Sequence, residues 1–370
     1  MSSRPVRFGG ARRVVVKIGS AVLRDGPEFD RVTFAALVRD LVGLVREGLE
    51  VICVCSGAVA LGLAQLGHGR RPERLSELQA TAAVGQGVLM RLWNDELGHY
   101  GKVAAQVLLT HDDLRHRGRF LAARHTLQAL LSLGAVPVIN ENDTVAVDEI
   151  KLGDNDMLSS QIVSLVGAGL LVILSDVEGL YDRDPRLPES RLLHTVPRID
   201  AELLAGAGGS SSGLGSGGMQ TKVQAVQQVN RLGVPGIIAR GKTPQVLRRL
   251  YEGEALGTWF AAEPDTMGSR KHWIAYASKP AGRLVVDAGA RLALLDRGRS
   301  LLPVGLRGVE GAFGAGDVVE LADEGGEVFA RGLANHPAEA LRAAVGGHLG
   351  DDAPEAVHRD DLVLLPEQLL

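Results

Sequence analysis

The residues best suited to chemistry lie in one acidic segment, residues 139–156. Its 18 residues carry three asparagines and six carboxylates against a single lysine, Lys151. Surfaces usually intersperse charges of both signs, so this density predicts a site that binds an ammonium group, a metal ion, or both. The alternative is a solvated acidic loop. The residues concerned are Asn140, Glu141, Asn142, Asp143, Asp148, Glu149, Asp154, Asn155 and Asp156.

The acidic segment begins where an apolar run at residues 135–139 ends, and this run predicts a buried parallel strand. Other polar residues stand at similar places. Lys17 closes a strand expected at 14–18, Ser56 follows one at 51–55, and Ser175 and Asp176 follow one at 170–174. Open α/β sheets hold their ligands beyond the carboxyl ends of their strands, so these residues are expected to meet at one edge.

A glycine-rich stretch, residues 206–218, leads into a helix that carries Lys222. It holds seven Gly and four Ser in thirteen residues. Glycine lets backbone amides turn toward an anion, and a helix N-terminus carries partial positive charge. Together with Lys17, Lys222 could hold an oligophosphate from two sides. A flexible linker is the plain alternative for such a composition.

Residues 236–243 also satisfy the P-loop pattern G-x-x-x-x-G-K-[ST], with Lys242 as its lysine. We interpret this match as accidental, because residues 237–239 predict the strand itself rather than a phosphate-binding loop. Thr243 and Pro244 are then expected to cap and begin a helix. Lys242 is therefore not expected to take part in catalysis.

Composition indicates an ordinary globular chain of 370 residues, long enough for two or three domains. Cys53 and Cys55 stand two apart on an expected strand, which makes them poor disulfide partners and suits a reducing cytosol. No apolar stretch reaches the ~18 residues that a membrane span needs, and Lys17 interrupts the first apolar run, which argues against a signal peptide. A cytoplasmic protein without a membrane partner is expected.

Strands and helices alternate from residue 12 to about 260, which predicts an α/β fold with a mainly parallel open sheet between helices. After about residue 280 the sequence changes to short β-type runs and Gly-rich turns, which predict a small β-rich domain. We expect a first domain at 1–262, a linker at 263–280 and a second domain at 281–370. The main expected helices are 33–48, 75–97, 120–133, 157–166 and 221–232; the tail is expected to form strands at 282–286, 293–295, 317–321 and 327–330 and a helix at 338–345.

Eight motifs resemble, in order, those of the glutamate 5-kinases, which have the amino acid kinase fold. The tail resembles a PUA domain, and the resemblance covers nearly the whole chain. Each motif alone is weak, whereas eight in order are specific. They are Val15-Val-Lys-Ile-Gly-Ser20, Ser56-Gly-Ala58, Ala83-Val-Gly-Gln86, Phe120-Leu-Ala-Ala-Arg124, Ile139-Asn-Glu-Asn-Asp143, Gly153-Asp-Asn-Asp156, Gly179-Leu-Tyr-Asp-Arg-Asp-Pro185 and Gly215-Ser-Gly-Gly-Met-Gln-Thr-Lys222.

This resemblance implies transfer of the γ-phosphoryl group of ATP to the side-chain carboxylate of L-glutamate, which gives glutamyl 5-phosphate, the first committed intermediate of proline synthesis. It also implies Mg²⁺ as cofactor, feedback inhibition by proline, a homo-oligomer and functional coupling to glutamyl phosphate reductase. Phosphoryl transfer needs mostly positioning and charge neutralisation, which fits a site rich in lysines and carboxylates.

The resemblance also implies roles for individual residues. Ser175 and Ser216 stand where the family pattern has Thr, and each keeps a hydroxyl group. Lys17, Lys222 and Asp156 would be catalytic. Glutamate would be bound by Ser56, Asn140, Asp143 and Asn155, with Asp143 as partner of the α-ammonium group. Asp154 and Asp156 would organise the lysines or Mg²⁺. The nucleotide would be bound by Lys17, Ser175, Asp176, Ser216, Gly217, Gly218, Met219, Gln220, Thr221 and Lys222.

Two alternatives remain open at this point. Another carboxylate kinase of the same fold, such as acetylglutamate kinase or aspartokinase, would share the architecture, although acetylglutamate has no ammonium group for Asp143. The tail could instead bind RNA. Residues 281–370 contain eight Arg, no Lys and fifteen Asp or Glu, a balance of −7, with Phe313 and Phe329 as their only aromatic residues. A nucleic-acid partner is therefore not expected.

Overall fold

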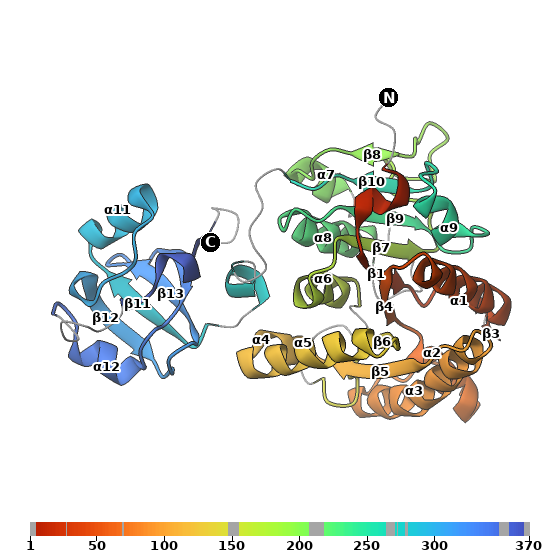
Figure 1. Cartoon of the computed structure of the whole chain (residues 1–370), viewed down its shortest axis with the longest axis horizontal. Coiled ribbons are helices and arrows are strands. Elements are labelled where there is room, and N and C mark those ends of the chain that lie inside the picture. The colour runs from red at the N-terminus through yellow and green to blue at the C-terminus, as the bar shows by residue number, and fades with distance from the viewer. Residues whose placement is uncertain are drawn as a thin grey trace. The chain divides into compact units, whose positions relative to one another are not determined.

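The computed structural model describes residues 5–26, 28–68, 70–146, 155–206, 218–263, 271, 273–277, 280–347 and 355–365. The chain divides into two compact units. The first comprises residues 1–113 and 121–266, and the second comprises residues 114–120 and 267–370. Each unit has a sheet of its own (Figure 1).

The first unit is built on an eight-stranded sheet in the order β5-β6-β4-β1-β7-β9-β10-β8. Its described strand pairs are parallel except β9 with β10, which run antiparallel. The predicted mainly parallel sheet is therefore confirmed. The strands are β1 (Arg13–Ile18), β4 (Glu50–Cys55), β5 (Ala104–Leu109), β6 (Val136–Glu141), β7 (Leu170–Ser175), β8 (Thr195–Val196), β9 (Gly236–Arg240) and β10 (Thr258–Phe260). A short hairpin, β2 (Arg24–Asp25) with β3 (Glu28–Phe29), stands apart from this sheet.

Helices cover this sheet, and the five main helices predicted from the sequence are among them (Figure 1). The shorter helices at 58–66, 111–115 and 201–206 were not predicted. Observed bounds differ from the expected ones by a few residues at most. Asp30 caps the first long helix, because its side chain accepts a hydrogen bond from the Thr33 amide at 2.9 Å. The helices are α1 (Arg31–Arg46), α2 (Ala58–Leu66), α3 (Leu75–Gly98), α4 (His111–Arg115), α5 (Arg117–Ser132), α6 (Asn155–Val166), α7 (Ala201–Gly206), α8 (Met219–Asn230) and α9 (Val246–Tyr251).

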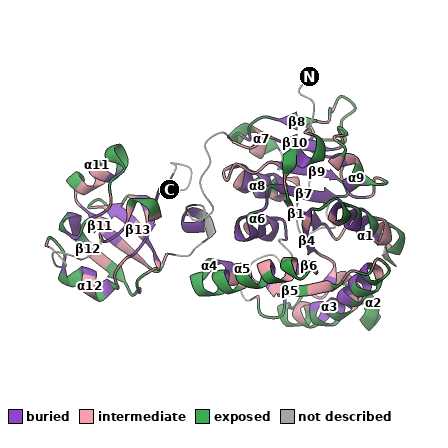
Figure 2. Cartoon of the chain, viewed as in Figure 1, coloured by how far each residue is buried: buried purple, intermediate pink, exposed green. Residues whose placement is uncertain are grey.

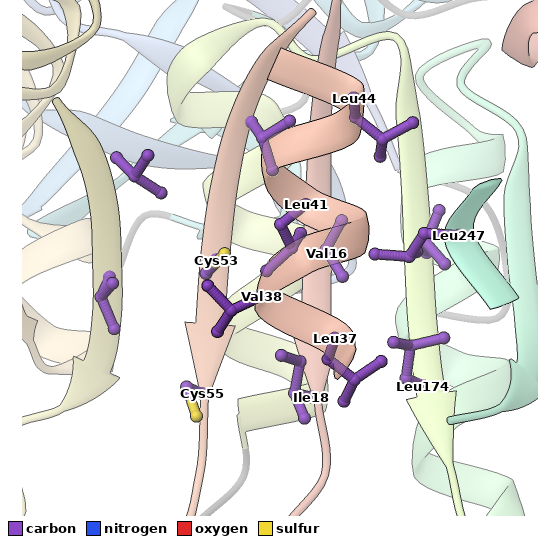
Figure 3. Close-up of a cluster of buried hydrophobic side chains, with 14 of the residues drawn as sticks. Val16, Ile18, Leu37, Val38, Leu41, Leu44, Cys53, Cys55, Leu174 and Leu247 are labelled. Carbon is purple, nitrogen blue, oxygen red and sulfur yellow. The ribbon is translucent and has the colours of Figure 1, made fainter. Parts of the chain in front are cut away.

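The core on one face of the sheet is mainly aliphatic, and Phe8, Phe34 and Trp93 are buried in it as well. Val16 and Ile18 of β1 lie under Leu37, Val38 and Leu41 of α1 (Figure 3). The central strands are buried along almost their entire length (Figure 2). Since side chains alternate across a strand, burial of this face sends the intervening residues of β1, among them Lys17, to the opposite face. Helix α6 contacts β1 and packs against α8.

Helices α2 and α3 approach each other so closely that their backbones nearly touch. A Cβ atom on Gly85 of α3 would lie 1.7 Å from the carbonyl oxygen of Ala58, and one on Gly62 of α2 would lie 1.9 Å from that of Thr81. Glycine is therefore required at both places. This contact fixes the start of α2, and with it Ser56, against the middle of α3.

The second unit contains a five-stranded sheet in the order β12-β11-β13-β14-β15, and β11 runs parallel to β13 in its middle. The prediction of a β-rich tail is confirmed. Its elements are β11 (Gly282–Val286), α11 (Ala288–Arg297), β12 (Leu306–Gly311), β13 (Val318–Asp323), β14 (Val328–Leu333), α12 (Ala338–Ala343) and β15 (Leu362–Leu364).

The expected strand at 293–295 was wrong, because these residues belong to α11. A run of three apolar residues is too short to distinguish strand from helix. The capping residues were the better signal. Asp287 accepts a hydrogen bond from the Ala290 amide at 2.7 Å, and Gly298 ends the helix in the left-handed conformation at φ +55°.

Part of the expected linker is structured. Residues 273–277 form one π-helical turn, and Trp273 and Ile274 are buried. Within the second unit the indole nitrogen of Trp273 donates to the carbonyl oxygen of Leu114 at 3.0 Å. None of the described helices is long and apolar enough to cross a bilayer.

Candidate active site

The candidate site lies at the carboxyl edge of the large sheet, around its central strand β1. The chain first extends the sheet on one side of β1 through β4, and later returns to place β7 on the other side. This reversal makes β1 a topological switch point, where such sheets hold ligands. The Gly19 amide donates to the Leu174 carbonyl at 3.0 Å, and the Ser56 amide donates to the Ile18 carbonyl at 3.2 Å.

Two buried lysines meet one buried carboxylate at this edge. Lys17 Nζ lies 2.6 Å from Asp156 Oδ1, and Lys222 Nζ lies 3.3 Å from Asp156 Oδ2. Exposed fractions of these three residues are only 5%, 7% and 2%. They come from β1, α8 and the first turn of α6. The group carries one net positive charge, so it is suited to hold an anion.

The charges of this group control its protonation. Burial would raise the pKa of Asp156, but the ammonium groups of Lys17 and Lys222 outweigh it and lower this pKa to about 2. Burial lowers the pKa of Lys222, and Asp156 opposes that effect. Thr221 Oγ1 lies within hydrogen-bonding distance of Asp156 Oδ2, at 3.0 Å. The Asp156 carboxylate is thus ionised at neutral pH and holds both cations in place.

Three buried amides and a hydroxyl form a second cluster, which we call the amide relay (Gln86, Asn140, Asn155 and Ser56). Asn140 Nδ2 donates to Gln86 Oε1 at 2.9 Å. Asn155 Nδ2 donates to Asn140 Oδ1 at 2.9 Å and to Ser56 Oγ at 2.7 Å. Asn155 directly precedes Asp156 in α6, so the relay adjoins the lysines.

Asp143 lies three residues after Asn140 of the relay and is 8% exposed. Burial, with help from the neighbouring charge of Glu141, raises its pKa to about 7. Its Oδ1 atom is buried and has no hydrogen-bond partner among the described residues. An acid that ionises near neutrality inside such a site is a candidate ligand for a cationic group.

Comparisons with known proteins agree with this architecture. An amino acid kinase family model matches residues 12–240, and a PUA domain model matches residues 282–351. A protein named glutamate 5-kinase from Myxococcus xanthus is 48% identical over 96% of this chain and 97% of its own length. Proteins of the same name from Pseudomonas putida (48%) and Syntrophotalea carbinolica (45%) match 96% and 95% of this chain.

The chain belongs to the glutamate 5-kinase family. The predicted family and the predicted amino acid kinase fold with a PUA tail are therefore confirmed. Six of the residues selected from the sequence form two groups in contact at one edge of the sheet. Lys17 and Lys222 contact Asp156, and Ser56 and Asn140 contact Asn155, the residue before Asp156.

The other described residues expected at the nucleotide lie around the start of α8 and the end of β7. Ser175 Oγ donates to Asp176 Oδ1 at 3.0 Å. The negative charge of Asp176 acts to raise the pKa of Lys222, against the effect of burial. Gly218 precedes α8, whose first residues are Met219 and Gln220. Ser216, Gly217 and Asp154 lie outside the described residues.

Lys222 and Thr221 also contact the turn that precedes their helix. Lys222 Nζ lies 3.3 Å and Thr221 Oγ1 lies 2.9 Å from the carbonyl oxygen of Gly218. This places both side chains at the N-terminal end of α8 rather than along its flank. A helix N-terminus with a lysine folded back over it is a suitable site for phosphate oxygens.

Lys242, the lysine of the P-loop match, belongs to a different structure. Residues 236–240 form strand β9, as expected, and Lys242 Nζ lies 3.3 Å from Asp30 Oδ2. The expected helix start at Thr243 and Pro244 was wrong, because α9 begins at Val246 after Gln245 at φ +54°. Lys242 thus braces the start of α1.

One member of the relay was not selected from the sequence. Gln86 belonged to a recognised motif, but no role was assigned to it, because its contact with Asn140 joins residues 54 positions apart. Gly85 beside it was the available signal. A glycine in the middle of a helix costs stability unless another backbone comes close, and here that backbone is α2.

Proposed function

We propose that this protein phosphorylates the side-chain carboxylate of L-glutamate with ATP and so forms L-glutamyl 5-phosphate for proline synthesis. Membership of the glutamate 5-kinase family supports the proposal. The structural observation that carries it is the buried group of Lys17, Asp156 and Lys222 beside the amide relay. The group of Lys17, Asp156 and Lys222 suits a phosphate anion, and the amide relay suits an amino acid.

The reaction is an in-line displacement in which a glutamate carboxylate oxygen attacks the γ-phosphorus and ADP leaves. The protein needs to supply alignment and positive charge rather than a covalent intermediate. Lys17 and Lys222 supply that charge from opposite sides of Asp156, which keeps them fixed before the substrate arrives. Preorganised charge of this kind requires no rearrangement during the reaction.

Glutamate would lie over the amide relay. The Ser56 hydroxyl and the adjacent amides suit a carboxylate, while Asp143 suits the α-ammonium group. Its raised pKa supports this role, because the arriving ammonium group would replace the missing counter-charge of a buried carboxylate. A free amino group is thus part of the proposed recognition, which disfavours N-acetylglutamate.

Magnesium remains part of the proposal and would enter with the phosphates of ATP, which supply most of its ligands. Asp156 does not fit as a metal ligand. Its Oδ1 meets Lys17, and its Oδ2 meets Lys222 and Thr221. Among the described residues no group of three or more His, Cys, Asp or Glu side chains is arranged to hold a metal. We therefore propose that Asp156 holds Lys17 and Lys222 in place and does not bind Mg²⁺.

The test is hydroxamate formation with Mg-ATP and hydroxylamine, comparing L-glutamate, L-aspartate and N-acetyl-L-glutamate as acceptors. We expect hydroxamate with L-glutamate and its loss by roughly a hundredfold or more in Lys222→Ala, the size seen when one donor that stabilises transition-state charge is removed. Lys242→Ala is the matched control and should retain kcat. Preference for N-acetylglutamate would contradict the proposed substrate.

Proline inhibition is the regulatory part of the proposal. We infer that proline competes at the glutamate site, because its carboxylate and secondary ammonium could use the same partners. Proline should raise the apparent KM for glutamate and leave kcat unchanged in initial-rate measurements at saturating ATP. A fall in kcat at constant KM would indicate a separate site.

We further propose a homo-oligomer, functional coupling to glutamyl phosphate reductase and a cytoplasmic location. The location is supported by Cys53 and Cys55, which are buried free thiols. We also propose that residues 1–262 form the kinase domain, 263–280 a linker and 281–370 the PUA-like domain. The PUA match at 282–351 supports the last of these boundaries.

A further inference from the structure

Gln86 on α3 is a buried polar residue at the candidate site with no role assigned so far. It is 9% exposed, and its Oε1 accepts the hydrogen bond from Asn140 Nδ2. Helix α3 contributes none of the residues proposed to bind glutamate or ATP. Gln86 thus contacts a proposed glutamate-binding residue, Asn140, from a helix that does not itself bind the proposed ligands.

A single backbone donor fixes the orientation of all three amides in the relay. The Glu141 amide donates to Asn140 Oδ1 at 2.9 Å, and a backbone N–H can only donate. Asn140 must therefore present its oxygen there and its nitrogen to Gln86, which must present oxygen in turn. By the same logic Asn155 must approach Asn140 with its nitrogen.

This orientation determines what the relay presents to a ligand. Both hydrogens of Asn155 Nδ2 are used, one on Asn140 Oδ1 and one on Ser56 Oγ. Ser56 accepts in this bond, so its own hydrogen is free to donate to a carboxylate. Asn155 Oδ1 has no hydrogen-bond partner among the described residues, which leaves an acceptor for an ammonium group.

We propose that Gln86 is a positioning residue for the amino acid substrate, an inference that rests on the proposed function. Its oxygen holds Asn140, Asn140 holds Asn155, and Asn155 sets Ser56 as a donor. Without Gln86, Asn140 Nδ2 is a buried donor that has lost its acceptor, although the Glu141 amide still faces Asn140 Oδ1. The Asn140 side chain then shifts and no longer holds Asn155 and Ser56 in place under glutamate, although Gln86 itself does not touch the substrate.

A second glutamine on the same face of α3 supports this assignment. Gln79 lies seven residues, or about two helical turns, before Gln86. Its Nε2 donates to the carbonyl oxygen of Ala146 at 3.0 Å. Helix α3 thus holds both ends of the segment 140–146, and Asp143 lies between them. The helix determines where this whole segment stands.

The test compares Gln86→Met, which keeps length but removes the acceptor, with Gln86→Glu, which keeps an oxygen for Asn140. Gln65→Met on the exposed side of α2 is the matched control. We expect Gln86→Met to raise the KM for glutamate roughly ten- to a hundredfold, the scale of a buried donor left unpaired. The KM for ATP should stay within about twofold, and Gln86→Glu should lie between Gln86→Met and the wild type.

A double-mutant cycle with Ser56→Ala tests the relay itself. If Gln86 acts through Ser56, the two changes together should raise the KM for glutamate by less than the product of their separate effects. Effects that multiply, or an equal rise in both KM values, would overturn the positioning role. A wild type that forms no hydroxamate from glutamate would refute the proposed function instead, so the two failures are distinguishable.

Discussion

At the scale of single residues, the centre of the site is one carboxylate shared by two lysines. Asp156 has one oxygen for each ammonium group, so neither lysine can move without losing its partner. Buried charges are tolerated only when paired, which is why a strand as apolar as β1 can carry Lys17. The proposed chemistry and the stability of the fold therefore depend on the same ion pairs.

Replacing Asp156 with asparagine should lower the free energy of unfolding by about 3–5 kcal/mol, because two buried cations lose their counter-charge. Asp95→Asn on the exposed side of α3 is the control and should change it by less than about 0.5 kcal/mol. Urea denaturation at neutral pH gives both numbers. An Asp156→Asn protein as stable as the wild type would show that the lysines are solvated.

The low pKa of Asp156 also predicts that the free energy of unfolding decreases in acid. The folded-state pKa of about 2 lies below the ordinary value of 3.8. The stabilisation is therefore complete above pH 3.8 and is lost as the pH falls toward 2. Other carboxylates titrate in this range, so the acid unfolding of the wild type should be compared with that of Asp156→Asn. The difference between the two gives the contribution of Asp156.

Asp143 predicts a pH dependence of opposite sign. Its pKa of about 7 is raised, so ionisation destabilises the empty folded protein as the pH rises from about 4 to 7. In the proposed binding mode, glutamate needs the ionised form of Asp143. We expect the KM for glutamate to fall as the pH rises from 6 to 8, and to become independent of pH in this range in Asp143→Asn. Initial rates at saturating ATP across this range provide the test.

At the scale of elements, apolar periodicity predicted most of the main sheet and its helices. Continuous runs such as β7 and the spaced apolar residues of α1 left little choice of structure. The prediction failed at α11, where three apolar residues were judged without their caps. Strand ends indicated which polar side chains come together, because parallel strands bring their carboxyl ends to one edge.

What the sequence could not predict is how the side chains of that edge pair. The lysines, Asp143 and the asparagines were selected as a group, but the shared carboxylate and the relay depend on contacts between distant elements. Gln86 shows the limit most clearly. Its neighbours in sequence indicate a helix, and its proposed role rests on a hydrogen bond to Asn140, 54 residues away.

The contact between α2 and α3 predicts opposite effects for two glycines of the same helix. Gly85→Ala should destabilise the protein by at least about 2 kcal/mol, because its Cβ would strike the Ala58 carbonyl and the backbones must separate. Gly87→Ala meets no atom within 4 Å and should stabilise it by about 0.5–1 kcal/mol. Thermal and urea unfolding measure both. Equal effects would mean that the helices are not in contact.

At the scale of the whole molecule, the two cysteines report on opening of the sheet. Both lie in β4, between β1 and β6, and are fully buried. Burial raises the pKa of the Cys55 thiol to about 12, and it raises that of Cys53 as well. A thiolate is the reactive form, so neither should react with a thiol reagent while the sheet is closed.

We therefore expect no labelling of the native protein by a thiol-specific chromophore, and two labels per chain in denaturant. Slow labelling under native conditions should follow the rate of global opening and become slower with bound nucleotide. Rapid labelling of one thiol in the folded protein would show that the edge beside Ser56 opens locally.

The central position of β1 has a consequence for how the protein is made. Lys17 is synthesised early, whereas Asp156 follows about 140 residues later and Lys222 about 200 residues later. At cellular elongation rates the ribosome needs roughly 10–40 s for that distance. Throughout this interval β1 is an apolar strand of high β-propensity, and its only charge within the run 14–18 is an unpaired lysine. Before Lys17 can serve the proposed reaction, we therefore expect it to act as a gatekeeper that discourages the nascent chain from aggregating.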